Sequence, residues 1–120
     1  MGSAYSAGPK ALDLSLNLLT NCSFPNGLTN LATLTLGANL LTNLTLPMGL
    51  IGLTSFDLEN NRITSLTLPA GLTNLTGLFL RSNQLTNLLL PPDLTHLASL
   101  DVLGPQRSPT TENTLSWQHS

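Results

Sequence analysis

The chain repeats itself every 22 residues, and this period limits the possible fold more than any other feature of the sequence. Four columns of residues keep the same register along the chain. They are Asn17, Asn39, Asn61 and Asn83; Thr20, Thr42, Thr64 and Thr86; Pro25, Pro47, Pro69 and Pro91; and Gly27, Gly49 and Gly71. A fixed period in the twenties is typical of a solenoid, in which each repeat forms one coil and packs against its neighbours.

The period divides the chain into four full units, residues 9–30, 31–52, 53–74 and 75–96, and a partial fifth unit, residues 97–104. Residues 1–8 precede the repeats as an extension or cap, and residues 105–120 follow them as a polar tail. Because 120 residues suffice for only one small domain, we predict a single repeat domain over residues 9–104.

Each unit contains two alternating stretches that predict short strands. Residues 33–36, Thr-Leu-Thr-Leu, have the period of two that a half-buried strand requires, and residues 41–46 repeat the alternation further along the unit. We expect the first stretches to stack into a parallel sheet and the second stretches to lie on the opposite side of each coil. The inward columns of the second stretch are Leu19, Leu41, Ile63 and Leu85; Cys22, Leu44, Leu66 and Leu88; and Phe24, Leu46, Leu68 and Leu90.

Turn residues separate the predicted strands. The motif Pro-x-Gly-Leu predicts a tight turn with Pro at its second position and Gly at its fourth. Asp93 replaces this Gly in the fourth unit, and we expect a left-handed backbone there. The spacing of three between Leu72 and Leu75 predicts a single helical or 3₁₀ turn that leads into the next unit. At the end of the first strand, a buried Asn would bond backbone groups of its own and adjacent coils, so we predict a structural role for the Asn column.

The opening half of each unit matches the pattern L-x-x-L-x-L-x-x-N-x-L, as in LATLTLGANLL from residue 31. With this motif, residues 9–104 resemble the leucine-rich repeat family, in its short bacterial form with L-T-x-L-x-L-P after the Asn. The resemblance implies a right-handed solenoid, shaped as a horseshoe or arc. Its parallel β-sheet would form the concave face, with short extended or 3₁₀ segments on the convex face and little or no α-helix. It also implies a non-catalytic protein-binding module.

Composition excludes several other classes of function. Charged residues make up 8% of the chain and the net charge is -2, so no basic stripe is available to neutralise the phosphates of a nucleic acid. Thr, Asn or Gly interrupts every Leu-rich run before it reaches the roughly 18 apolar residues of a membrane span. Residues 1–8 lack the features of a secretory signal, but this leaves the localisation undetermined.

No catalytic or metal constellation is apparent, and we expect neither an enzyme nor a cofactor. Neither His96 nor His119 has a Ser or Cys at motif spacing. The only cysteine, Cys22, excludes an internal disulfide and lies in a Leu column, so we predict a buried, inert thiol. Asp57 and Asp101 lie two strands apart, about 9.6 Å by the spacing of strands, which is too far for both to bind one calcium ion.

The outward positions of the predicted first strands carry most of the charge. Five of the eight charged residues between positions 9 and 106 lie there, and elsewhere the surface consists mainly of Thr, Ser, Asn and Leu. Because recognition usually depends on variable positions of a rigid scaffold, we predict that a protein partner binds this concave sheet. The predicted partner-binding residues are Asp57, Glu59, Phe79, Arg81 and Asp101.

The sequence also predicts how two parts of this site are arranged. Phe79 is expected to be exposed, and it would either anchor the partner or cover the neighbouring sheet surface. Glu59 and Arg81 are expected to face each other on adjacent strands and to form an ion pair worth at most about 1 kcal/mol.

The convex segment supports an alternative function. Asn21, Ser23, Asn43, Thr45, Ser65, Thr67 and Asn87 would form a regular uncharged array, which is the kind of surface that binds ice or carbohydrate, although Leu89 interrupts it. A purely structural or engineered repeat scaffold is the other alternative. An uncovered apolar end also favours self-association. We therefore expect a homodimer through the C-terminal end coil, residues 97–103, with the tail near Trp117 taking part.

Overall fold

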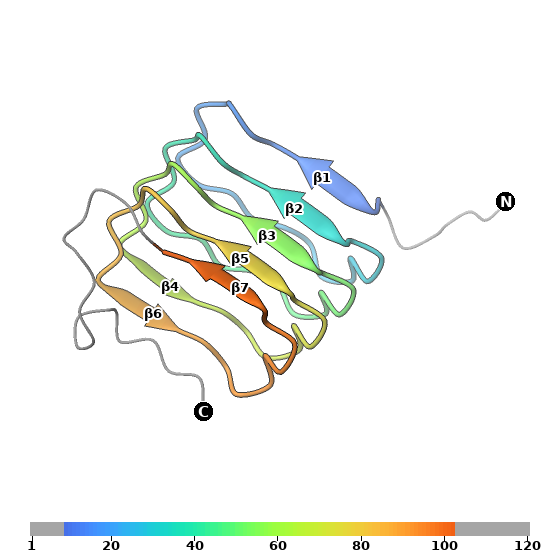
Figure 1. Cartoon of the computed structure of the whole chain (residues 1–120). Helices are drawn as coiled ribbons and strands as arrows, with labels where there is room; N and C mark the ends of the chain where they lie inside the picture. Colours follow the sequence, from blue (N-terminus) through green and yellow to red (C-terminus); the bar gives the residue numbers. More distant parts are fainter. Residues whose placement is uncertain (1–8, 103–120) are drawn as a thin grey trace, which may run out of the picture.

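The computed structural model describes residues 9–102, and it confirms the solenoid that the sequence predicts. Five three-residue strands lie side by side in one parallel sheet, in the order β1-β2-β3-β5-β7 (Figure 1). They are β1 (Ala11–Asp13), β2 (Thr33–Thr35), β3 (Ser55–Asp57), β5 (Gly77–Phe79) and β7 (Ser99–Asp101). The register is that of the repeat, since Leu34 pairs with Phe56 and Phe56 pairs with Leu78.

A second, smaller sheet lies on the opposite side of the coils (Figure 1). It consists of β4 (Ser65–Thr67) and β6 (Asn87–Leu89), which pair in parallel. The sequence predicts an extended segment here in every coil, but within residues 9–102 only the third and fourth coils form paired strands on this side. In the described part of the chain, no helix has the length and apolarity that crossing a membrane requires.

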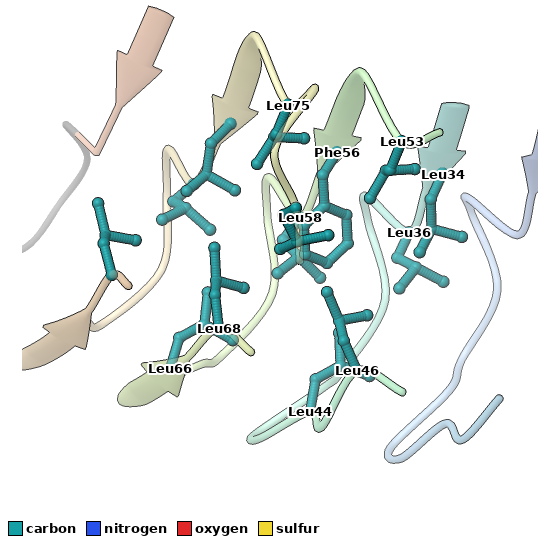
Figure 2. Packing of buried hydrophobic residues seen from close by; sticks show 14 of the residues in the cluster. Leu34, Leu36, Leu44, Leu46, Leu53, Phe56, Leu58, Leu66, Leu68 and Leu75 are labelled. Carbon is teal, nitrogen blue, oxygen red and sulfur yellow. The ribbon is translucent and has the colours of Figure 1, made fainter. Parts of the chain in front are cut away.

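Leucine columns fill the interior between the two sides of each coil. Figure 2 shows Leu34, Phe56 and Leu58 pointing inward from the larger sheet, toward Leu44, Leu46, Leu66 and Leu68 of the opposite segments. Phe56 replaces a Leu of its column and is completely buried. Burying a side chain of this size contributes about 1.5 to 3 kcal/mol. The core is weaker at the first coil, where Leu12, Leu14, Leu19 and Phe24 are only partly buried, because within residues 9–102 a coil packs against one side of them only.

The proline turns differ from the prediction. In the second and third coils Pro47 and Pro69 are the first residues of the turns, and Gly49 and Gly71 occupy the third position with φ of +94° and +100°. A positive φ at the third position is what a type II turn requires, and this explains the glycine. The Leu-x-x-Leu segment that follows forms one hydrogen-bonded turn, with Leu75 N donating to Leu72 O at 3.2 Å.

The prediction of a left-handed backbone at Asp93 is also wrong, because this residue does not have a positive φ. The turn after Pro91 closes through Leu94 N donating to Pro91 O at 3.4 Å, without a positive φ at its third position. The side chain of Asp93 reaches back instead, and its Oδ2 accepts a hydrogen bond of 2.9 Å from Gly71 N of the preceding coil. The carboxylate therefore links the turns of two coils.

A column of left-handed residues immediately precedes the Asn column, and the sequence analysis did not identify it. Leu16, Ala38, Asn60 and Ser82 have φ between 58° and 64°. Only Asn readily adopts this conformation among the four residue types present. Each of these residues lies three positions after the last residue of a strand of the larger sheet.

Candidate functional site

The outward face of the five-stranded sheet, which we call the concave face, brings the five predicted partner-binding residues onto three neighbouring strands. Asp57 and Glu59 come from β3 and its end, Phe79 and Arg81 from β5 and its end, and Asp101 from β7. The register places Asp57 opposite Phe79 and Phe79 opposite Asp101. All are partly exposed.

The ion pair of Arg81 differs from the prediction. Its Nε and Nη2 donate to Oδ2 of Asp101 at 3.1 and 2.9 Å, whereas the sequence analysis expected a pair with Glu59. Asp101 lies opposite Phe79, so the long Arg81 side chain reaches diagonally across to it. Because the Arg81 and Asp101 side chains are 52% and 28% exposed, the pair contributes at most about 1 kcal/mol.

Glu59 lies at the acidic centre of the concave face. Partial burial is the main cause that raises the pKa of its carboxyl above the ordinary value, and the charges of Asp57 and Asp101 add to the shift. Arg81 acts in the opposite direction and lowers the pKa. Three carboxylates, those of Asp57, Glu59 and Asp101, thus share this part of the concave face with one guanidinium.

Asp57 is tied to the backbone of its own strand end. Its Oδ1 accepts a 2.8 Å hydrogen bond from Glu59 N, and Asp13 makes the equivalent 2.9 Å bond with Ser15 N in the first coil. Hydrogen bonds to Ser15 lower the pKa of Asp13. These bonds satisfy N–H groups where the strand ends. The sequence does contain the pattern that could have predicted these bonds, because each Asp precedes the N–H group that it binds by two residues.

Phe79 is half-buried, whereas the sequence analysis expected it to be exposed. Its ring lies over Gly77, two residues earlier on the same face, and a Cβ built on Gly77 would be 2.8 Å from Cζ of the ring. The ring thus covers the sheet surface that the glycine leaves bare. Its free side still borders an open hollow of 640 Å³, whose other lining residues are Arg81, Ala98, Ser99, Leu100, Asp101 and Val102.

The Asn column lies at the edge of the concave face, where the strands end. Asn61 Nδ2 donates to Leu36 O of the preceding coil at 3.0 Å and to Leu58 O of its own coil at 3.1 Å, and its Oδ1 accepts from Leu41 N at 2.9 Å. Asn39 and Asn83 are also buried and repeat this pattern.

Asn17 differs from the other three asparagines because it is exposed. Its Nδ2 donates to Leu14 O and Ser15 O of its own coil. Its position in the first coil accounts for the difference, since no coil of the described part precedes it.

The predicted convex array is exposed but is not continuous. An open groove of 410 Å³ separates the second and third coils there, and its lining residues are Asn43, Leu44, Thr45, Leu46, Ser65, Thr67, Leu68 and Pro69. In the described part of the chain, β4 and β6 are the strands that pair on this side. The flat, evenly spaced surface that ice binding needs is therefore interrupted between these coils.

The remaining reactive side chains are dispersed. Cys22 is half-buried rather than buried because it lies in the first coil, and burial raises the pKa of its thiol. The Nδ1 atom of His96 lies 2.9 Å from Thr73 O, on the surface of the fourth coil. In residues 9–102, no three His, Cys, Asp or Glu side chains gather as a metal site would require. His119 lies outside the described residues, as does Trp117 of the homodimer expected from the sequence.

Comparison with known families agrees with this architecture. The family model described as Leucine Rich repeats (2 copies) matches residues 51–96, which include β3, β4, β5 and β6. No curated protein and no solved structure matches the chain.

Proposed function

Because the repeats of this chain are leucine-rich repeats, a family that commonly serves as a protein-binding module, we propose that the chain binds a protein partner through its concave face. Leucine-rich repeat solenoids are typically non-catalytic, and we propose no enzymatic activity. The observation that carries the proposal is the concentration of charge on one face. Asp13, Asp57, Glu59, Arg81 and Asp101 lie there, and only Lys10, Arg62 and Asp93 carry charge elsewhere in residues 9–102.

The charge of the face favours a basic partner surface. Four carboxylates stand against one guanidinium, which Asp101 already pairs. Glu59 is the carboxylate best suited to bind an incoming Lys or Arg, because a cation beside it would relieve the repulsion from Asp57 and Asp101. The half-buried ring of Phe79 supplies the apolar contact next to these charges.

The test uses binders selected from a displayed library against the parent chain. We expect Phe79→Ala to weaken their binding by about 2 kcal/mol or more, roughly 30-fold, as truncating a central aromatic commonly does. Glu59→Gln should weaken binding less and reduce its salt dependence. Thr45→Ala and Thr67→Ala are the matched controls on the convex side, and they should change neither the affinity for the binder nor its salt dependence.

Circular dichroism must accompany these titrations, because Phe79 also covers Gly77. Losing half the burial of a Phe side chain costs about 1 kcal/mol of folding free energy, so Phe79→Ala should remain folded. Binding that is insensitive to Phe79→Ala and Glu59→Gln would remove the concave-face proposal. If the parent chain showed thermal hysteresis and the Thr45→Ala and Thr67→Ala variants lost it, ice binding would be favoured. If the library yielded no binder, a purely structural scaffold would be favoured.

A further inference from the structure

The proline turn of the first coil contains Asn26 followed directly by Gly27, and no other asparagine of the chain precedes a glycine. Both residues are exposed. The side chain of Asn26 forms no hydrogen bond with the described residues, and Gly27 N donates to none of them. The amide of Asn26 and the backbone nitrogen of Gly27 are thus two neighbouring polar groups that the described part of the fold leaves unbound.

The exposure of Asn26 belongs to its position in the repeat rather than to its place in the first coil. The equivalent residues Met48, Ala70 and Pro92 are exposed too, and Met48 is 59% exposed. Met48 and Ala70 belong to the second and third coils, which have a neighbouring coil on each side. This position therefore faces solvent inside the solenoid as well as at its end.

Gly27 leaves its own backbone nitrogen accessible. Its φ is +90°, a conformation that glycine adopts freely, and a Cβ built on it would meet no described atom within 4 Å. The equivalent nitrogen in the third coil is held, because Gly71 N donates to Oδ2 of Asp93, 22 residues later, at 2.9 Å. The residue 22 positions after Gly27 is Gly49, which has no side chain that could bind the nitrogen in the same way.

We propose that Asn26 is a site of spontaneous deamidation, made reactive in the folded chain by the unbound nitrogen of Gly27. When Gly27 N loses its proton to a base in the solvent, the nitrogen attacks Cγ of Asn26. A C–N bond forms and ammonia leaves, which gives a succinimide ring. Water then adds to one of the two ring carbonyls and opens the ring to aspartate or isoaspartate. The net reaction converts the amide and one water to a carboxylate and ammonium.

Other exposed asparagines lack this combination. Asn43, Asn74 and Asn87 are each followed by a leucine whose side chain is buried in the core. The buried leucine fixes the backbone nitrogen that would have to move toward the amide carbon, and its side chain crowds the approach. Asn74 is restrained further, since its Nδ2 donates to Ile51 O at 2.8 Å. The reaction is therefore expected at Asn26 in preference to these residues.

Deamidation at Asn26 changes a part of the molecule that the proposed partner-binding residues do not occupy. The new carboxylate makes the net charge of the chain more negative than -2. Isoaspartate also lengthens the backbone of the turn by one carbon. None of the concave-face residues belongs to this turn, so the reaction should leave binding at the concave face intact, and each proposal can be tested independently of the other.

The experiment incubates the full chain at mildly alkaline pH, both folded and unfolded in guanidinium chloride. Trypsin cleaves after Lys10 and Arg62, and fragmentation of the peptide between them locates each amide that has become a carboxyl. An isoaspartyl methyltransferase with labelled S-adenosylmethionine detects isoaspartate. Asn26→Ala removes the site and introduces the residue that the third coil has there. Ala70→Asn creates the same dipeptide where Asp93 holds the glycine nitrogen.

We expect Asn26 to deaminate in the folded chain at a rate within about tenfold of the unfolded rate, because its turn is not protected by hydrogen bonds. Asn26→Ala should abolish the isoaspartate signal. In the folded Ala70→Asn variant the new site should react at least tenfold more slowly than Asn26, and unfolding should remove the difference. A folded chain in which Asn26 reacts more than tenfold more slowly than when unfolded would overturn the proposal. So would equal rates at the two Asn-Gly sites of the folded variant, or reaction mainly at other asparagines.

Discussion

Single asparagine side chains connect backbone groups of two coils shortly after strands β2, β3 and β5 of the larger sheet. Asn61 bonds Leu36 O and Leu41 N of the second coil and Leu58 O of its own coil. Leu cannot replace these bonds, and a buried backbone group left unpaired costs on the order of 1 to 3 kcal/mol. We therefore propose that the column is structural.

Asn61→Leu should accordingly lower the free energy of unfolding by about 3 kcal/mol or more, measured by urea denaturation. Asn17→Leu is the matched control, because Asn17 is exposed and bonds only its own coil. Its loss should stay below about 1 kcal/mol. Equal losses for the two variants would show that the bonds between coils contribute little.

The left-handed column gives a second prediction at this scale. Ala38 and Asn60 occupy equivalent positions with φ of 58° and 60°, and Asn tolerates this conformation better than Ala. Ala38→Asn should raise the melting temperature and Asn60→Ala should lower it, each by the equivalent of about 1 kcal/mol. If both substitutions shifted the melting temperature in the same direction, backbone conformation would not be the governing factor.

At the residue level, a uniform column showed where an element ends but not the geometry of the turn, since Pro47 and Gly49 lie one position earlier in their turn than predicted. The Asn and Pro columns are identical in all four units, and their period alone locates them at the ends of the extended segments. The left-handed column contains Leu, Ala, Asn and Ser, so no residue type marks its conformation. The pairing of Arg81 was also beyond prediction, because it depends on how far a flexible side chain reaches across the sheet.

Among the elements, the two sides of the solenoid differ in how completely they pair. The larger sheet links all five coils, whereas the smaller sheet links only the third and fourth. Periodicity predicted both sets of extended segments, since alternation shows which side chains point inward. It does not show whether adjacent segments approach closely enough to bond, so the groove between the second and third coils was not predicted.

Amide hydrogen exchange can test this difference with one matched pair of residues. Leu46 and Leu68 occupy the same column and their side chains are equally buried, at 5% and 4% exposure. Leu68 N donates to Leu89 O at 3.1 Å, whereas Leu46 N donates to no group of the described residues. The amide of Leu68 should exchange at least tenfold more slowly than that of Leu46. Equal protection would mean that the groove closes in solution.

On the scale of the whole molecule, the repeated residues determine the solenoid, and the proposed partner-binding residues lie at positions where the units differ from one another. The solenoid follows from the period and the inward leucines, and the family match agrees with it. The identity of the partner cannot be derived in the same way, because the charged and aromatic residues of the concave face limit the partner's chemistry without identifying it. The ring of Phe79 lies over Gly77, and this packing could not be predicted from the sequence because it depends on the conformation of the Phe79 side chain.

The most direct test of partner binding at the concave face is to map a selected binder onto the chain by amide chemical-shift perturbation. We predict that the largest shifts fall on residues 55–59 and 77–81, around Glu59 and Phe79, with small shifts on β4 and β6. The Phe79→Ala chain should show these shifts only at much higher binder concentration. Shifts centred on β4, β6 and the groove at Thr45, with the concave residues unchanged, would contradict the account.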